Sequence, residues 1–572
     1  MLCSCVSTVD QAVSSEAPRA APQAAAPPAS EPAAAVPKSV SIEPAPTPAV
    51  PESVPTEPAP TSAVPKSVPT EPAPTAAVPK SVPTEPAPTV EVTGIDSLFA
   101  NGKKPNIVMI LTDQERSLQH WPESFTKEHL PAMSKLMESG LSFKQGFTSA
   151  ACCAPSRASF VTSKYPFEHG VQKTGTPQPE VTLPVGITTI ASILTEVGYT
   201  CVWKGKWHIG GDPEDHGFMG WNPPECGNSL SQDDTMGGGT PNNDGRVVKD
   251  MVKFLDNPPE PFFMFASFVN PHDCYAAQHD PVNGYSQEDF NRVQVPAPTN
   301  WDEDLDTKPR AQKYMSIPYV PFKNSVQEYC NFYAYLHTLV DSKILKLLNK
   351  IDESGIADNT LTIRFADHGE MSLSHGLVEK VWNSYEESIH IPFVFHNPKI
   401  WPTAQTSDSM ASSMDLLPTL CDLLGVLEKY EGEFRGNSLK AAIQDPSKSV
   451  QDTIHFTFDD VSLGNIPSVL RCIRSAKYKY TVYFTEDGRD ADWELYDLMK
   501  DPLENNNLAG IQEHIDVQRE MENKLVETMT KKKTIPTDFT WPPNLTMFSR
   551  GADHHGQATV QMAEGKKFDL GH

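Results

Sequence analysis

Three continuous apolar runs of strand length limit the folds open to this chain: residues 106–112 (NIVMILT), 262–269 (FFMFASFV) and 361–366 (LTIRFA). A half-exposed strand alternates apolar and polar residues, whereas an unbroken run is typical of a strand buried on both faces of a parallel sheet. Helical spacing recurs between the runs, at 190–197 and over about 325–352. Strands that alternate with helices predict an α/β fold with helices on both faces of the sheet.

The first 93 residues cannot belong to such a fold. No Phe, Trp or Tyr precedes Phe99, and a 14-residue unit recurs there, starting at Val36, Val50, Val64 and Val78. A segment without large apolar side chains cannot offset the entropy lost on ordering. We therefore predict that residues 1–93 are a disordered Pro/Ala/Thr-rich repeat tail that acts as an extended spacer.

Polar side chains follow four of the expected strands. Asp113-Gln114 follows the first run, His272 follows FFMFASFVNP, Asp367-His368 follows LTIRFA, and KGKWH, with Lys206 and His208, follows a strand expected at 199–203. A single Asp in such a place is commonly a turn residue or a helix cap. Ligands of open α/β sheets, however, bind at the carboxyl ends of the strands, so four such ends indicate a site.

The residues Asp113, Gln114, Asp367 and His368 are candidate metal ligands. Several oxygen ligands suit a hard cation such as Ca²⁺ or Mg²⁺, and a histidine ligand is also compatible with Mn²⁺.

Cys153 opens the segment CAPSR. Pro155 suits the first turn of a helix through Thr162, which would place Cys153 at the positive end of that helix, with Arg157 as a nearby cation. A cysteine-phosphatase loop needs five residues between Cys and Arg, and here there are three, so that reading fails. A simple packed thiol is the other reading.

CAPSR resembles the sulfatase signature C-x-P-S-R, whose cysteine is oxidised to formylglycine by a dedicated maturase. Further blocks are similar to those of sulfatases and occur in the same order: GYTCVWKGKWH (198–208), ADHGEMSLSHGLVEK (366–380), MDLLPTLCDLLG (414–425) and ELYDLMKDPLENNNLA (494–509). The resemblance covers about residues 104–510. It implies an alkaline-phosphatase-like fold, with a mixed, mostly parallel sheet sandwiched by helices and a smaller C-terminal α+β subdomain.

The same resemblance implies roles for individual residues. Asp113, Gln114, Asp367 and His368 would hold one divalent cation, expected to be Ca²⁺, with the formylglycine at Cys153 completing the ligand shell. Arg157 would support the formylglycine hydrate, which is the nucleophile. The groups that bind sulfate and transfer protons would be Lys206, His208, His272 and Lys380. The implied activity is the hydrolysis of a sulfate monoester, of the arylsulfatase or choline-sulfatase type.

The expected domains are the tail, a catalytic domain at 94–427, an α+β subdomain at 428–536 and an irregular extension at 537–572. The subdomain is expected to contain strands at 477–484 and 493–498 and a helix over about 511–530.

Three residues depart from the usual sulfatase pattern. Gln114 replaces a common Asp, His368 replaces a common Asn, and Ser163 replaces a common Gly. The first two leave open a phosphodiesterase or phosphonate monoester hydrolase on the same fold. A sulfatase-like binding protein without catalysis is the second alternative.

Composition constrains the partners. The net charge of −26 predicts a surface that repels nucleic acid. The sequence contains no run of 18 apolar residues, so we predict no membrane span. The start, MLCSCVSTVDQ, lacks the pattern of a secretion signal, yet the sequon Asn544-Leu545-Thr546 and the Pro/Thr-rich tail favour a secreted protein. The pattern does not identify the sulfate ester, which a small molecule or a saccharide could carry.

Overall fold

The computed structural model describes residues 94–175, 181–222, 243–278, 285–316 and 326–535. The tail at 1–93, the extension at 537–572 and the sequon at Asn544 lie outside the described residues. No helix among the described residues is long and apolar enough to cross a membrane.

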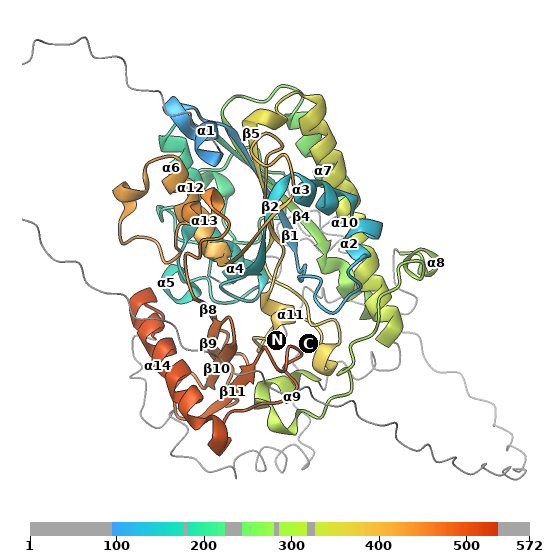
Figure 1. The fold of residues 1–572 in the computed structure, drawn as a ribbon, viewed down its shortest axis with the longest axis vertical. Coiled ribbons are helices and arrows are strands. Elements are labelled where there is room, and N and C mark those ends of the chain that lie inside the picture. Colours follow the sequence, from blue (N-terminus) through green and yellow to red (C-terminus); the bar gives the residue numbers. More distant parts are fainter. Residues whose placement is uncertain (1–93, 176–180, 223–242, 279–284, 317–325, 536–572) are drawn as a thin grey trace, which may run out of the picture. The chain divides into compact units, whose positions relative to one another are not determined.

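A seven-stranded sheet with the strand order β3-β4-β1-β5-β6-β2-β7 forms the centre of the fold (Figure 1). Its strands are β1 (Asn106–Asp113), β2 (Gly140–Phe147), β3 (Thr200–Gly205), β4 (Phe262–Pro271), β5 (Thr360–Ala366), β6 (Phe393–His396) and β7 (Gln405–Ser412). All pairs are parallel except those of β6, which runs antiparallel to both β5 and β2. The predicted mixed, mostly parallel sheet is confirmed.

The three apolar runs are buried at every position, as expected for strands covered on both faces. Two separate apolar cores explain this burial. Side chains such as Met109 and Phe265 pack on one face, whereas Val108 and Met264 pack on the other. The alternation of neighbouring residues between two cores follows from the two-residue period of a strand.

Helices cover both faces of this sheet (Figure 1). One face carries α1 (Ile95–Phe99), α4 (Cys153–Thr162), α6 (Ile190–Glu196), α12 (Leu416–Leu423) and α13 (Lys440–Gln444). The other carries α2 (Phe125–His129), α3 (Pro131–Glu138), α7 (Asp244–Phe254) and α10 (Val326–Glu353). Four further helices are short: α5 (Pro166–His169), α8 (Gln287–Phe290), α9 (Arg310–Ser316) and α11 (Glu386–Ile389).

A second sheet, of four antiparallel strands, follows in the chain, in the order β11-β10-β9-β8. Its strands are β8 (Thr453–Phe458), β9 (Val469–Ser475), β10 (Tyr478–Phe484) and β11 (Ala491–Asp497). Helix α14 (Ile515–Lys532) packs on this sheet through Met521, Leu525 and Met529. The predicted α+β character of this region is confirmed.

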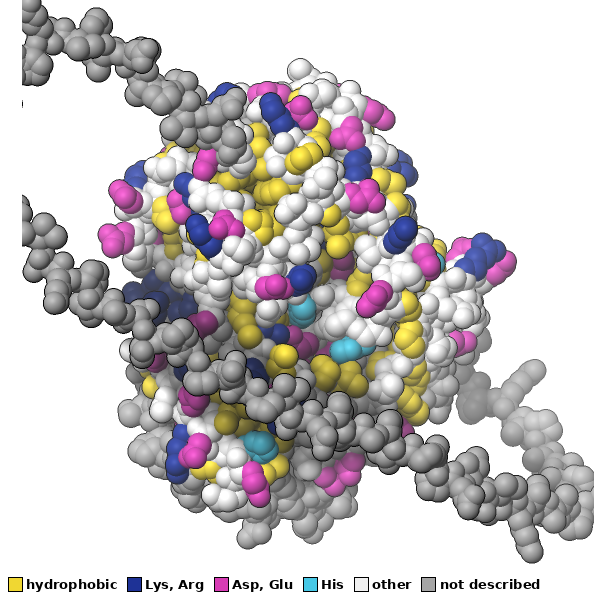
Figure 2. Space-filling model, viewed as in Figure 1, with side chains coloured by type: hydrophobic (Ala, Val, Ile, Leu, Met, Phe, Trp, Pro, Cys, Tyr) yellow, Lys and Arg dark blue, Asp and Glu magenta, His cyan; other side chains and the backbone are white. Residues whose placement is uncertain are grey.

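The surface in view carries acidic and basic side chains that are interspersed rather than separated into single-sign areas (Figure 2).

Candidate active site

The carboxyl ends of β1 and β5 meet because these strands are parallel neighbours in register, with Thr112 opposite Ala366. Asp113 and Asp367 therefore leave the sheet side by side, and Asp367 N donates to Thr112 O at 3.2 Å. The strands thus bring together two carboxylates that are 254 positions apart in the chain.

Four side chains form a closed cluster at this edge. One ligand atom from each of Asp113, Cys153, Asp367 and His368 lies within 4.8 Å of the others, and all four residues are buried. The structure thus brings the predicted ligands Asp113, Asp367 and His368 together with Cys153 of the CAPSR segment.

Cys153 is the first residue of α4, and Cys152 before it has a left-handed backbone with φ 67°. The thiol Sγ lies 3.4 Å from Asp113 Oδ1, 3.3 Å from His368 Nε2 and 3.7 Å from Lys206 Nζ. Burial, together with the Asp113 carboxylate, raises the pKa of Cys153 well above its usual value. The thiol is therefore protonated, which disfavours a thiolate nucleophile.

Arg157, one turn further along α4, is fully buried and holds both carboxylates. Its Nη2 donates to Asp113 Oδ2 and its Nε to Asp367 Oδ2, each at 2.9 Å. Its Nη1 donates to Lys206 O at 2.8 Å and to Ser267 Oγ at 3.0 Å. The four hydrogen bonds orient the carboxylates and the Lys206 segment, and none of them ends on Cys153.

Lys206 lies inside the cluster, with Nζ 2.5 Å from Asp113 Oδ2. His208 is oriented differently: its Nε2 lies 3.1 Å from Gly175 O. Strand β3 ends at Gly205, and His208 has a left-handed backbone with φ 57°, so Lys206 and His208 lie beyond the extended segment. The turn there lets the two side chains leave the backbone in different directions.

His272 and Lys380 both contact Tyr275. The His272 ring packs against the Tyr275 ring with centroids 4.9 Å apart, and Lys380 Nζ donates to Tyr275 OH at 2.7 Å. Lys380 Nζ also donates to Gln114 Oε1 at 2.9 Å. The structure therefore links Lys380 to the predicted metal ligand Gln114 by a direct hydrogen bond.

Gln114 is held by a residue that the sequence analysis did not single out. Its Nε2 donates to Glu370 Oε2, while Glu370 Oε1 accepts from Tyr329 OH at 2.9 Å and from Glu379 N at 2.7 Å. Since the NH₂ of Gln114 faces Glu370, its amide oxygen faces Lys380. The available signal was the uncharged Gln114 itself, whose amide needs a buried acceptor.

The electrostatics of the cluster fit a divalent cation. Burial alone would raise the pKa of Asp113, but Lys206, His272 and Arg157 together hold it well below its usual value. Burial and the neighbouring Asp113 raise the pKa of Asp367 to about 7. Two carboxylates this close and this buried repel each other, and a cation between them would remove that repulsion.

His368 adds a suitable nitrogen ligand. Burial, together with Lys380, lowers its pKa well below the usual value, so the ring is neutral. Its Nδ1 lies 2.9 Å from Gly369 O, and a hydrogen on Nδ1 leaves the Nε2 lone pair facing the cluster. Metal-binding histidines are oriented by such a bond from the other ring nitrogen. The donor set within the cluster therefore includes two carboxylates and one imidazole.

The mixed, mostly parallel sheet covered by helices is a fold of the alkaline-phosphatase type. The family model for sulfatases matches residues 105–426, and the model described as "N-sulphoglucosamine sulphohydrolase, C-terminal" matches 374–531. The chain belongs to the sulfatase family, whose members hydrolyse sulfate esters.

Individual relatives agree with this family. The chain is 26% identical over 451 residues to a Delta 4,5-hexuronate-2-O-sulfatase of Bacteroides thetaiotaomicron. The alignment covers 75% of this chain and 90% of the relative. A solved structure of a 2-O GAG sulfatase matches with a TM-score of 0.62 at 24% identity, covering 78% of this chain and 96% of that one. The phosphonate monoester hydrolase of Agrobacterium radiobacter shares the fold, with a TM-score of 0.56 at 19% identity and coverages of 75% and 96%.

Proposed function

We propose that this protein is a formylglycine-dependent sulfatase that binds one divalent cation and hydrolyses a sulfate monoester carried on a saccharide. The observation that carries the proposal is the position of Cys153, whose protonated thiol lies among Asp113, Lys206 and His368 at the start of α4. The saccharide is supported by the similarity to the hexuronate-2-O-sulfatase. Aryl and choline sulfates are the other substrates to be compared.

In this proposal Asp113, Asp367 and His368, with the Gln114 amide oxygen, hold the cation, and the oxygen-rich donor set favours Ca²⁺ over softer ions. When present, the cation and the formylglycine supply charge neutralisation and the nucleophilic oxygen. A maturase that converts Cys153 is a partner that the proposal requires.

The remaining groups of the site act on the substrate. Lys206 and Lys380 carry positive charge toward the position of the sulfate oxygens, and fixed charges in a buried site stabilise a transition state more than they would in water. His272 protonates the leaving alcohol, and His208 accepts a proton when the sulfate is released. Arg157 keeps both carboxylates oriented through its bonds to their Oδ2 atoms.

We also propose that 94–427 is the catalytic domain and that the subdomain at 428–536 completes it. Contacts across this boundary support the pairing of the two parts. Arg474 of β9 forms an ion pair with Glu386, and Tyr165 OH donates to His455 O.

The test is a turnover series on protein produced with and without a maturase. A sulfated unsaturated disaccharide, an aryl sulfate, choline sulfate and a phosphate diester are compared, and peptide mass spectrometry is used to look for formylglycine at position 153. We expect conversion at Cys153 rather than Cys152, turnover only after conversion, and none in Cys153→Ala. Full activity with an unmodified Cys153 would refute the mechanism. Faster turnover of the diester would favour the phosphodiesterase alternative, and inactivity of converted, metal-bound protein would favour a binding protein.

A further inference from the structure

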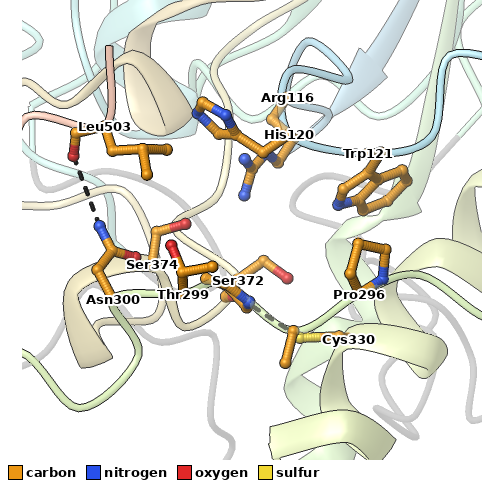
Figure 3. A pocket seen from close by; sticks show the side chains of 12 residues that line it. Arg116, His120, Trp121, Pro296, Thr299, Asn300, Cys330, Ser372, Ser374 and Leu503 are labelled. Atoms are coloured by element: carbon orange, nitrogen blue, oxygen red, sulfur yellow. Dashed lines mark hydrogen bonds between the residues drawn. The ribbon is translucent and has the colours of Figure 1, made fainter. Parts of the chain in front are cut away.

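A cavity of about 230 Å³ lies among residues that take no part in the candidate active site (Figure 3). Its walls come from the segment after β1, the loop before α9, the first turns of α10 and the loop after β5. A cavity that holds a single water has a volume of about 10–15 Å³, so this cavity has room for a small ligand.

Arg116 enters this cavity with unused hydrogen-bonding capacity. The residue is only 2% exposed, and its guanidinium makes two long hydrogen bonds of 3.3 Å, to Met371 O and Gln119 O. Its Nε has no acceptor among the described residues, and its ion pair with Glu387 spans 3.9 Å. Charge-assisted bonds of arginine are normally 2.7–2.9 Å long, so this cation is incompletely paired. Figure 3 shows its guanidinium directed toward the open centre of the cavity.

The wall opposite Arg116 offers hydroxyl groups. Ser372 and Ser374 are each 2% exposed and line the cavity, and among the described residues their hydroxyls form no hydrogen bond. These hydroxyls can therefore bond a group that enters the cavity. Trp121 adds an aromatic wall, and His120 is held beside it in a left-handed backbone with φ 72°. Such a conformation is unusual for a residue with a side chain and is common at binding sites.

We propose that this cavity is a second binding site, separate from the catalytic cluster, for an oxyanion carried on a hydroxylated ring. The Arg116 guanidinium suits a carboxylate or sulfate group, because its planar fork matches two oxygens. Ser372 and Ser374 suit ring hydroxyls, and Trp121 provides an apolar surface for one side of the ring. Glu387 does not line the cavity but balances the charge of Arg116, so the site selects through hydrogen-bond geometry more than through net charge.

Calorimetric titration tests this site on Cys153→Ala protein, which cannot turn over a sulfate ester. The probes are glucuronate, glucose 6-sulfate and neutral glucose. Arg116→Gln removes the cation, and Thr299→Trp fills the cavity from an exposed position in its wall. Thr403→Trp, at another exposed threonine, is the matched control.

We expect glucuronate, glucose 6-sulfate or both to bind, with affinity at least tenfold lower in Arg116→Gln and in Thr299→Trp but unchanged in Thr403→Trp. Lys206→Ala on the same background separates the two sites, because binding in the cavity should survive it. If only glucuronate still binds in Lys206→Ala, the oxyanion of the site is a carboxylate. If only glucose 6-sulfate still binds, it is a sulfate. Equal binding of glucose, no saturable binding of either acid, or binding that persists in Thr299→Trp would overturn the proposal.

Discussion

Exchanging the amide of Gln114 and the carboxylate of Glu370, singly and together, tests whether their hydrogen bond orients the Gln114 amide toward Lys380. In Glu370→Gln, the new amide oxygen can keep the bonds from Tyr329 OH and Glu379 N, which places its NH₂ opposite the NH₂ of Gln114. Two donors then face each other, and the Gln114 amide must turn. Its NH₂ would face the ammonium group of Lys380, and their 2.9 Å bond would be lost. Losing one charge-assisted bond costs about 1.5–3 kcal/mol, which is roughly a 10- to 150-fold fall in kcat/KM.

Gln114→Glu alone should be at least as harmful, because it places a second carboxylate against the buried Glu370. The double variant, Gln114→Glu with Glu370→Gln, should recover. In it the NH₂ at position 370 donates to the new carboxylate, whose other oxygen accepts from Lys380. We therefore expect the double variant to lie within about tenfold of the wild type and the effects of the single changes to be non-additive by about 1–3 kcal/mol.

The assay is kcat/KM for an aryl sulfate on matured protein, together with the melting temperature and the calcium affinity. Glu494→Gln is the matched control, because Glu494 of β11 is a buried carboxylate that accepts bonds from Gln312 of α9 and Tyr483 of β10. Glu494→Gln should lower the melting temperature. Unlike Glu370→Gln, it should leave kcat/KM close to that of the wild type. Additive losses in the Gln114/Glu370 double variant would refute the reasoning, and a loss of stability equal to that of Glu494→Gln with normal kcat/KM would reduce Glu370 to a structural role.

Three further predictions concern metal, substrate and pH. Asp367→Asn should lower metal content and calcium affinity and abolish turnover while the protein stays folded, and full metal occupancy in that variant would contradict the assignment. Lys206→Ala should lower kcat/KM for an aryl sulfate by about 10- to 150-fold but affect a phosphate diester much less, since a diester has one fewer non-bridging oxygen to contact the site. Burial lowers the pKa of His169 from 6.5 to about 3, so the unfolded chain binds a proton that the folded one does not. Stability should therefore fall as pH drops below about 6.5, by about 1.4 kcal/mol per unit from this group, and urea unfolding at two pH values should show a flatter slope in His169→Gln.

The sheet could be predicted where strands are buried on both faces. Unbroken apolar runs of this length are short for a buried helix and therefore favour a strand, so the polar residues after β1 and β5 were expected at the same edge of the sheet. Strand β7 escaped prediction because it begins with polar, exposed residues at the margin of the sheet. Strands β8 and β9 escaped because they contain His455 and Arg471, which are buried through hydrogen bonds that form only in the folded chain.

The positions of the candidate site residues were easier to predict than their orientations and hydrogen bonds. Asp113 and Asp367 are fixed by their strands, so sequence position determines where they lie. The orientation of His208 depends on a left-handed turn in a non-glycine residue, which no sequence pattern announces. Glu370 gains its role only through Gln114, 256 positions earlier in the chain, and such a pairing cannot be read from a single sequence.

The spacing of Cys153 and Arg157 has a physical reason in this geometry. Residues four apart on a helix lie on one face, so the first turns of α4 present the thiol and the guanidinium to the same two carboxylates. Arg157 takes the Oδ2 atom of both Asp113 and Asp367, which leaves Asp113 Oδ1 toward Cys153 and Asp367 Oδ1 toward His368. One extra residue between the two would rotate Arg157 by about 100° around the helix and uncouple it from the carboxylates. The five-residue spacing of a cysteine phosphatase therefore cannot build this site, whereas three intervening residues orient the carboxylates and place residue 153 beside their free oxygens.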